Sequence, residues 1–532
     1  MKFINIVYLC STTESNKDSC DLVPLFFLTM KNNKKTNDWL KFKKYLHLSP
    51  PFEAEDKKWV INYVSNPKKV SAHRFYPFIH YSVKANGFRR IMDTATGLRN
   101  RLRSKKQKTR EIYYANHLDS CIYSYYGKLI NDKLDEIYKG NESLNNSVIA
   151  YRRIAVNEHR NKCNIDFANE VFQYIRSSNQ LNLTVLCFDI KSFFDTLNHK
   201  ILKKAWCKLL DEKCLPTDHY QVFKAITDFV YVEIGDLIEE FEELKIKKMS
   251  YIKERALESF CKTDIEFRER VKKKGLIKAN KIDFKKGTPR IYGIPQGSPI
   301  SATLSNLYLL DFDRFILEQV ENIGGLYKRY SDDILVVCPI EHAEVIKNSV
   351  YNYIKEDLKL IIQAEKTQEV VFRRDNVTKP WNYATTENGQ PKKTPLSYLG
   401  FDFDGGKITV RQKSLALYYR NIKRLIRRKV NYAKSAKKYI EKYPNRKKDD
   451  WIYRARIYKT KSHLGAKRKR LNNKVFWGNY ISYIKTASKI MNEPALNKQV
   501  KNHWRIIERL INKAEILHEL PKTPSRRKKK TS

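Results

Sequence analysis

The four residues Tyr330-Ser331-Asp332-Asp333 limit the possible folds of this chain most narrowly, because they set two adjacent carboxylates between two short apolar runs. Residues 324–329 and 334–338 predict the two strands of a hairpin with the carboxylates at its tip. Two neighbouring carboxylates on a tight turn repel each other, and a divalent metal that neutralises them is the readiest way to keep them there. Acidic turns are common and most are merely solvated, so a metal site needs support from other segments.

Two segments upstream provide that support. Residues 183–188 form a nearly continuous apolar run, which predicts a strand buried on both faces that ends at Asp189. In residues 293–301, Gly and Pro frame a sharp loop, and we expect a helix after it with Pro299 in its first turn. Each segment alone also fits an ordinary strand end or loop-to-helix junction. The apolar residues of the expected helix recur at helical spacing: Ile300, Leu304, Leu307 and Leu310.

In this order, the three segments resemble motifs A, B and C of the reverse transcriptase palm. Lys366 follows an amphipathic stretch at residues 345–358 and resembles motif D, while Tyr398, Leu399 and Gly400 resemble motif E, the primer grip. The resemblance covers roughly residues 70 to 405. It implies an α+β chain with the right-hand polymerase fold, in which fingers, a palm with an antiparallel sheet and a helical thumb are followed by an α-helical basic C-terminal region.

The resemblance also implies a chemistry. Nucleotidyl transfer can use two Mg²⁺ ions, about 3.5–4 Å apart, to stabilise the attacking and leaving oxygens. Asp189 and Asp332 would bridge the ions, Ile190 would contribute beside them and Asp333 would complete the acidic cluster, with Mn²⁺ able to substitute. Lys366 would donate a proton to pyrophosphate, although a solvent-facing lysine at a helix end fits the sequence equally well.

Phe194 bears on the choice of sugar. It lies five residues after Asp189, and reverse transcriptases carry an aromatic residue at this offset that packs under the sugar and clashes with a 2′-hydroxyl. RNA-dependent RNA polymerases carry a second aspartate there instead. The resemblance therefore implies selection of dNTPs, with simple core packing of Phe194 as the alternative.

Four further residues are candidates for nucleotide binding. Gln296 and Gly297 would set their loop against the incoming nucleotide and the template, where a small residue permits close backbone approach. Arg152 or Arg153, in the expected fingers, could hold the triphosphate. An arginine on a surface strand is the ordinary alternative for either.

Composition agrees with a nucleic-acid partner. The chain has 104 Lys and Arg against 58 Asp and Glu, a formal net charge of +46. Residues 411–532 alone hold 37 basic and seven acidic residues, so this segment would attract phosphate backbones in a salt-dependent way. Its interleaved tyrosines and tryptophans could stack on unpaired bases, although most of them are expected in helix cores.

The sequence divides into four predicted regions. Within the palm we expect an insertion at about residues 199–290, whose residues 234–241 are charged and helical. Met30 precedes a Lys- and Asn-rich stretch typical of a natural start, so residues 1–29 are expected to be a dispensable leader or a mis-assigned start, and residues 524–530 a disordered basic tail. The regions are an N-terminal extension (1–65), fingers (66–182), palm (183–395) and thumb with the helical basic C-terminal region (396–532).

Nine cysteines occur without a C-x-x-C pair or a His-rich cluster beside them. This pattern argues against a structural zinc site and predicts a reducing, cytoplasmic environment. No apolar run reaches the length of a membrane-spanning helix, so no membrane partner is expected.

Residues 147–152 and 164–172 resemble the fingers of bacterial unknown-group and abortive-infection reverse transcriptases, which include the defence-associated enzymes. This resemblance implies a bacterial enzyme that makes cDNA on a partner structured non-coding RNA in anti-phage defence, with dNTPs and an RNA–DNA hybrid as further partners and a homo-oligomer as one assembly. Two alternatives stay open. One is a group II intron-like maturase, and the other is a catalytically relict RNA-binding scaffold, which the complete set of three aspartates disfavours.

Overall fold

The computed structural model describes residues 39–522 except for 93–98, 159, 247–256, 281, 284–287, 365–366, 388–389, 447–448, 466–468, 472–473 and 477. The proposed leader at residues 1–29, Lys366 and the basic tail at residues 524–530 therefore lie outside the described residues.

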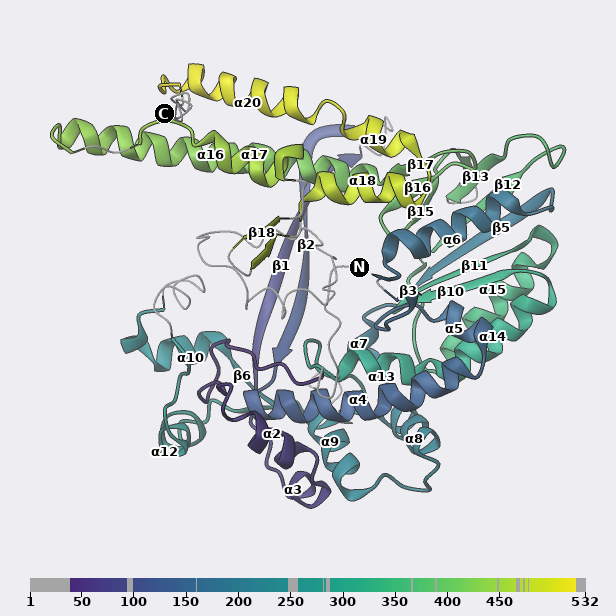
Figure 1. The fold of residues 1–532 in the computed structure, drawn as a ribbon. Helices are drawn as coiled ribbons and strands as arrows, with labels where there is room; N and C mark the ends of the chain where they lie inside the picture. The colour runs from purple at the N-terminus through teal and green to yellow at the C-terminus, as the bar shows by residue number, and fades with distance from the viewer. Residues whose placement is uncertain are drawn as a thin grey trace.

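A six-stranded antiparallel sheet forms the palm, in the order β10-β11-β5-β12-β13-β14. Helix α6 covers one face of it, and α14 and α15 cover the other (Figure 1). The palm elements are α6 (Asn164–Ser177), β5 (Asn182–Asp189), α7 (Phe193–Thr196), α13 (Ser301–Tyr308), α14 (Leu310–Asn322), β10 (Leu326–Tyr330), β11 (Asp333–Pro339), α15 (Ala343–Asn352), β12 (Gln368–Arg373), β13 (Asn382–Glu387) and β14 (Gln390–Lys392).

Strand β5 is mostly apolar because both of its faces are buried. Leu186 and Phe188 pack into a core shared with the helices of the fingers and with α13 and α14. Leu183 and Val185 point to the opposite face, into a second core that includes α6 and the C-terminal helices. Full burial of one such side chain contributes about 1.5–3 kcal/mol, so the strand is held firmly from both sides and its last residue, Asp189, is fixed at the sheet edge.

The fingers are built from a helical layer and a four-stranded sheet in the order β2-β1-β6-β7. Strands β1 and β2 form a long hairpin (Figure 1). The elements here are α2 (Lys57–Val64), α3 (Pro67–Ser71), β1 (Phe78–Met92), β2 (Arg99–Tyr114), α4 (His117–Lys139), α5 (Glu142–Ser147), β3 (Ala155–Asn157), β4 (Arg160–Asn161), α8 (His199–Leu210), α9 (Thr217–Thr227), β6 (Val230–Glu233), α10 (Ile234–Glu240), α12 (Asp264–Phe267), β7 (Lys278–Ala279), β8 (Ile282–Asp283) and β9 (Thr288–Pro289).

The insertion predicted within the palm packs on the fingers. Its strand β6 pairs in parallel with β1, with Ile79 opposite Val232, and a separate small core joins these residues to Leu237 and Phe241 of the insertion. The predicted helix at residues 234–241 is confirmed as α10. The insertion thus widens the fingers sheet.

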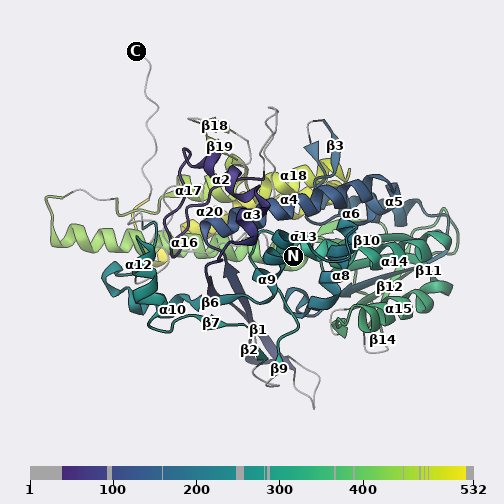
Figure 2. The same cartoon turned by 90° about the horizontal axis from the view of Figure 1, so that it is seen from below.

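A small antiparallel sheet, β15-β16-β17, connects the palm to the C-terminal helices. The longest of these, α16, runs over 31 residues and projects away from the palm, with α20 packed along it (Figures 1 and 2). These elements are β15 (Leu396–Tyr398), β16 (Phe401–Phe403), β17 (Ile408–Val410), α16 (Gln412–Lys442), α17 (Arg454–Lys461), β18 (Lys469–Leu471), β19 (Lys474–Phe476), α18 (Tyr480–Ile490), α19 (Pro494–Val500) and α20 (His503–Leu517).

The helix expected after the loop at residues 293–301 differs in two details. It begins at Ser301, so Pro299 precedes it and does not lie in its first turn. It is also interrupted at Leu309, which separates α13 from α14. Such differences of one or two residues are usual at helix ends. The four apolar residues predicted to share its buried face, Ile300, Leu304, Leu307 and Leu310, are all buried.

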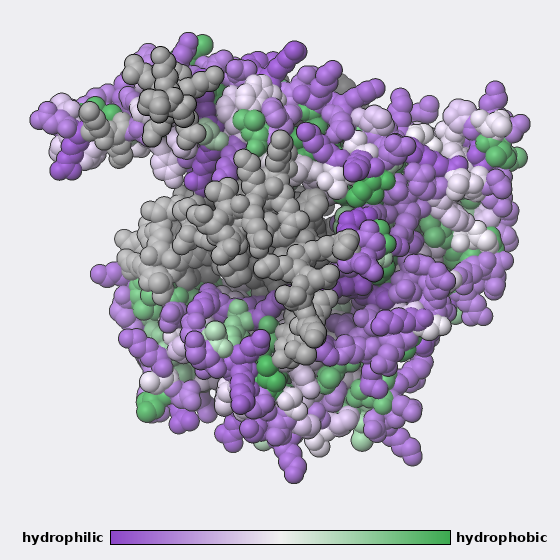
Figure 3. Space-filling model, in the orientation of Figure 1, coloured by the Kyte–Doolittle hydropathy of each residue, from purple (hydrophilic) through white to green (hydrophobic). Residues whose placement is uncertain are grey.

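The face of the molecule seen in Figure 3 is mostly hydrophilic, and hydrophobic residues are scattered over it in small groups. Scattered exposed apolar residues are normal for a protein surface and mark no interface by themselves. Within the described residues, no helix is both long and apolar enough to cross a membrane.

Candidate active site

Strand pairing brings the three predicted carboxylates together at one edge of the palm sheet. Asp189, the last residue of β5, lies directly opposite Asp333, the first residue of β11. The next residue after Asp189, Ile190, donates its backbone N–H to the carbonyl of Asp332 at 3.3 Å. Directly opposed residues of an antiparallel pair have Cβ atoms about 4.5–5.5 Å apart, so Asp189 and Asp333 share one face of the sheet.

The turn that carries Asp332 is tight. Tyr330 pairs with Asp333, so Ser331 and Asp332 form a two-residue connection between β10 and β11. Ser331 has a φ of 62°, in the left-handed region that costs a residue with a side chain about 1–3 kcal/mol. Its hydroxyl lies 2.9 Å from the hydroxyl of Tyr151, which also has a positive φ. The surrounding structure therefore holds a turn that the chain would not adopt by itself.

The donor set suits magnesium that arrives with a substrate. Mg²⁺ prefers oxygen ligands, keeps several waters and is bound by one or two carboxylates together with substrate phosphates. Among the described residues, no three Asp, Glu, His or Cys side chains are arranged to hold a metal ion by themselves. Asp189, Asp332 and Asp333 offer the carboxylate oxygens that Mg²⁺ binds together with the phosphates of a substrate.

The loop at residues 293–301 packs against the fingers hairpin. The carbonyl of Gln296 accepts a hydrogen bond of 2.9 Å from the backbone N–H of Tyr113 in β2. Gly297 has a φ of +119°, and a Cβ there would lie 2.7 Å from the carbonyl oxygen of Tyr113. The backbone at Gly297 thus lies close to β2, and the expected approach to the nucleotide and template stays a prediction.

Replacing Gly297 by alanine is expected to destabilise the fold by about 1–3 kcal/mol, because the added Cβ meets a backbone atom and the φ is unfavourable for a side chain. The change would appear as a lower midpoint of denaturant unfolding. Gly235 is a matched control, since a Cβ there meets nothing within 4 Å. Equal stability of Gly297→Ala and Gly235→Ala would contradict the expected strain.

Phe194 lies between the Asp189 segment and the same loop. It belongs to the short helix α7, and its carbonyl accepts a 2.8 Å hydrogen bond from the backbone N–H of Ile294. The ring is half-buried, with its centroid 5.5 Å from that of Phe193. The predicted role of Phe194 in sugar selection stays a prediction.

The two candidate arginines differ in their surroundings. The Arg152 guanidinium hydrogen-bonds to the carbonyl of Val148 at 2.9 Å, to the backbone and side chain of Asn145 and to Asp135, and it stacks on the Tyr138 ring at 3.8 Å. These contacts hold the Arg152 side chain in place, and its role in nucleotide binding stays a prediction. Arg153, the next residue, is exposed.

The sequence by itself does not distinguish Arg110 of β2 as a candidate. Burial lowers the pKa of its guanidinium, while the carboxylate of Asp332 acts in the opposite direction. The fingers hairpin therefore brings a positive charge within electrostatic reach of the acidic turn. In the sequence, Arg110 ends a run of basic residues from Arg99, and only the tertiary structure distinguishes it from them.

The hairpin that resembles motif E also lies beside the carboxylates. Leu399 and Gly400 form its turn, both with positive φ, and join β15 to β16. Tyr398 is 5% exposed, and its pKa is raised by burial and by the nearby carboxylate of Asp333. The predicted primer grip, Tyr398, Leu399 and Gly400, is thus in the neighbourhood of the acidic turn.

Residues 228–403 match a family model described as reverse transcriptase (RNA-dependent DNA polymerase). The chain contains a reverse transcriptase domain. The match confirms the predicted fold class, an α+β right-hand polymerase fold with an antiparallel palm sheet. The matched segment includes the loop at 293–301, the acidic turn and the motif E hairpin, but not Asp189. Pairing of β5 with β11 places Asp189 beside the matched segment.

Solved telomerase structures are similar at a low level to the chain that carries this reverse transcriptase domain. The apo telomerase of Candida tropicalis gives a TM-score of 0.35 at 12% identity, over 88% of this chain and 66% of that one. A form of this telomerase that lacks the C-terminal domain gives the same TM-score and identity, over 58% of this chain and 53% of that one. Telomerase from Candida albicans in complex with a fragment of telomeric RNA gives a TM-score of 0.34 at 12% identity, over 86% of this chain and 65% of that one. This chain thus spans about half to two thirds of their length. No curated protein matches it.

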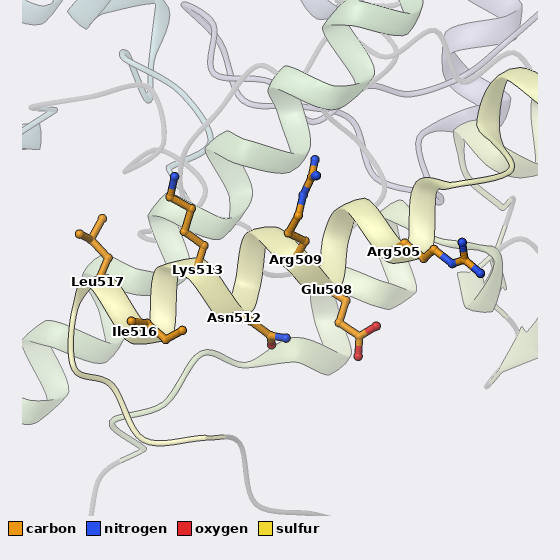
Figure 4. Close-up of a pocket in the computed structure, with 7 residues that line it drawn as sticks. All are labelled: Arg505, Glu508, Arg509, Asn512, Lys513, Ile516 and Leu517. Atoms are coloured by element: carbon orange, nitrogen blue, oxygen red, sulfur yellow. The ribbon is translucent and has the colours of Figure 1, made fainter.

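A shallow hollow lies far from the reverse transcriptase domain's carboxylates, on the outer face of α20 (Figure 4). Within the described residues, all of its lining side chains come from α20. Its residues are Arg505, Glu508, Arg509, Asn512, Lys513, Ile516 and Leu517.

Proposed function

We propose that the chain catalyses RNA-directed DNA synthesis, with Asp189, Asp332 and Asp333 as the ligands of two Mg²⁺ ions. The observation that carries this proposal is the direct pairing of Asp189 with Asp333 at the edge of the palm sheet. These residues are 144 positions apart in the sequence, yet they meet beside the acidic turn of a reverse transcriptase domain. When bound, the two ions would stabilise the attacking and leaving oxygens of nucleotidyl transfer.

The surrounding residues have separate proposed roles. Phe194 selects the deoxyribose, and Arg110 binds the triphosphate from the fingers side, a role in which Arg153 remains a second candidate. Gln296 and Gly297 fix the loop that joins the fingers to the palm. Lys366 is proposed as the proton donor to pyrophosphate, and the motif E hairpin as the support of the primer end.

The nucleic acid is proposed to bind along α16. Its buried face packs on α17 and α20, and its opposite face carries seven exposed basic residues over about 44 Å at 1.5 Å per residue. The only acidic residue of the helix is Glu441. Since α20 covers the other side, this face is turned toward the side where β1 and β2 lie (Figures 1 and 2). The seven residues, here termed the α16 stripe, are Lys413, Arg420, Arg424, Arg427, Lys434, Lys438 and Lys442.

Neutralising the distal α16 stripe by replacing Arg427, Lys434, Lys438 and Lys442 with Gln is expected to flatten the salt dependence of binding to an RNA–DNA duplex. Each phosphate that the protein no longer neutralises lowers the slope of log affinity against log salt by about 0.9, so four such phosphates lower it by about 3.6. The measurement is a fluorescence anisotropy titration at several salt concentrations.

A matched control removes the same charge elsewhere. Lys57, Lys58, Lys68 and Lys69 are exposed on α2 and α3 at the other end of the molecule (Figure 1). Their replacement with Gln is expected to leave the slope nearly unchanged. If both quadruple variants lowered the slope equally, the effect would come from net charge, and the α16 stripe would not be the binding surface.

The proposed biological role is cDNA synthesis on a cognate structured non-coding RNA in bacterial anti-phage defence, in the cytoplasm and with a homo-oligomer as one assembly. Support comes from the resemblance of residues 147–152 and 164–172 to defence-associated enzymes and from the long helical C-terminal region. A structured RNA gene beside the coding sequence would support defence, whereas flanking intron boundaries would support the maturase alternative. Sequencing the RNA and DNA that copurify with the protein identifies the template and the product.

Primer extension with Mg²⁺ tests the activity directly. We expect incorporation of dNTPs on a primed RNA template by the purified chain. RNA binding without extension on any template would instead favour the non-catalytic scaffold.

A further inference from the structure

A fully buried ion pair lies directly behind the acidic turn. The guanidinium of Arg329 donates from Nε and Nη2 to the two carboxylate oxygens of Asp313, each at 2.6 Å, and both side chains are 0% exposed. Tyr327 donates its hydroxyl to the same carboxylate at 2.6 Å. Two-point pairing of this kind fixes the orientation of the guanidinium and also compensates its charge.

The remaining side-chain nitrogen of Arg329 does not contact Asp313 and hydrogen-bonds to two other groups. Its Nη1 donates to the backbone carbonyl of Ser331 and to Oδ1 of Asn306, both at 3.2 Å. Asn306 in turn donates to the carbonyl of Ala150 at 3.0 Å. The pair therefore connects α13 and α14 both to the turn and to the segment that carries Tyr151.

The contact with Ser331 holds the backbone just before Asp332. The carbonyl of Ser331 belongs to the peptide unit that ends at the nitrogen of Asp332, and the carbonyl of Asp332 accepts from Ile190 on the other side. The backbone of Asp332 is thus held before and after its Cα. Ser331 has an unfavourable φ, so the turn needs such contacts to keep its shape.

We propose that Arg329 is a positioning residue, which through the Ser331 carbonyl fixes the carboxylate of Asp332 for binding of the metal–nucleotide pair. Asp313 and Asn306 hold the guanidinium in the required orientation. This inference rests on the proposed function in one respect, the assignment of Asp332 as a metal ligand. A purely structural ion pair would need the contact with Asp313 but not the contact with Ser331.

Arg329→Lys separates these two roles. A lysine ammonium can pair with Asp313, but it lacks the second nitrogen that would reach the Ser331 carbonyl at the same time. We expect a folded variant whose extension rate at saturating Mg²⁺ is at least about tenfold lower and whose half-saturating Mg²⁺ concentration is at least about tenfold higher. Binding of Mn²⁺ in the presence of dTTP, measured by electron paramagnetic resonance, is expected to weaken by a similar factor.

A second variant tests the same role in case Arg329→Lys does not fold. Arg329→Met combined with Asp313→Leu removes both charges, so no unpaired charge stays buried. It is expected to show the same weakened Mn²⁺ binding. Arg454→Met with Glu515→Leu is the control, since this paired arginine and glutamate lie in the C-terminal helices, and it should bind Mn²⁺ as the unmodified chain does.

The readouts separate failure of this inference from failure of the proposed activity. If the unmodified chain binds Mn²⁺ with dTTP but extends no primer, the proposed activity fails while the Mn²⁺ titrations of the variants still test Arg329. If a folded Arg329→Lys or double variant binds Mn²⁺ as tightly as the control, the positioning role is overturned.

Discussion

Replacing Asp332 by alanine is expected to lower primer extension by at least about 10³-fold, because the chain loses a ligand proposed to bridge both ions. Binding of an RNA–DNA duplex should change by less than about twofold. The proposed binding surface lies on α16, and the hydrogen bond from Ile190 to the backbone carbonyl of Asp332 does not require the carboxylate. The measurement is single-turnover extension alongside a binding titration.

Two further variants make this result specific. Asp332→Asn keeps the size of the side chain and removes its charge, so it should be nearly as inactive as the alanine variant. Asp375→Ala removes an exposed aspartate from the loop after β12 and should leave extension unchanged. More than about a tenth of normal activity in Asp332→Ala would exclude Asp332 as a bridging ligand.

Replacing Phe194 by alanine is expected to lower the preference for dNTPs over rNTPs by about 10- to 100-fold. The half-buried ring would no longer obstruct a 2′-hydroxyl, and the difference that one small group makes in a packed pocket is of this order. The quantity to measure is the ratio of kcat/KM for a deoxynucleotide to that for the matching ribonucleotide.

The ratio of the two kcat/KM values does not depend on how much of the variant is folded. Phe194 packs beside Phe193, so the alanine variant will also lose stability, but both substrates are tested on the same enzyme and a smaller folded fraction cancels from the ratio. Phe194→Tyr retains the ring and should retain the discrimination. An unchanged ratio in Phe194→Ala would mean that the ring serves only the core.

Local sequence patterns predicted the parts of the site that depend on neighbouring residues. Two apolar runs around Asp332 and Asp333 predicted the hairpin, and β10 and β11 confirm it. The apolar run before Asp189 predicted a strand buried on both faces, and its residues do pack into two different cores. Such patterns are informative because alternation and burial act over a few residues at a time.

Contacts between distant segments could not be predicted in this way. The insertion was placed in the palm from its position in the sequence, yet β6 pairs with β1 of the fingers. The sequence predicts Arg152 as a candidate for nucleotide binding, but it does not predict that the guanidinium contacts Asn145, Val148 and Tyr138. Whether a charged side chain serves a ligand or the fold depends on which distant groups surround it, and a single sequence does not contain that information.

The sequence by itself determined the polymerase motifs, the strongly basic C-terminal region and the strand and turn that carry the carboxylates. Only the tertiary structure decided that Asp189 lies opposite Asp333, that Arg110 reaches the acidic turn and that Arg329 supports it from behind. The physical reason is the distance along the sequence over which each kind of interaction acts. Side-chain periodicity is set by the geometry of a single strand or helix. A site whose proposed metal ligands are 144 residues apart is assembled by burial and by backbone pairing between strands that meet only in the folded chain.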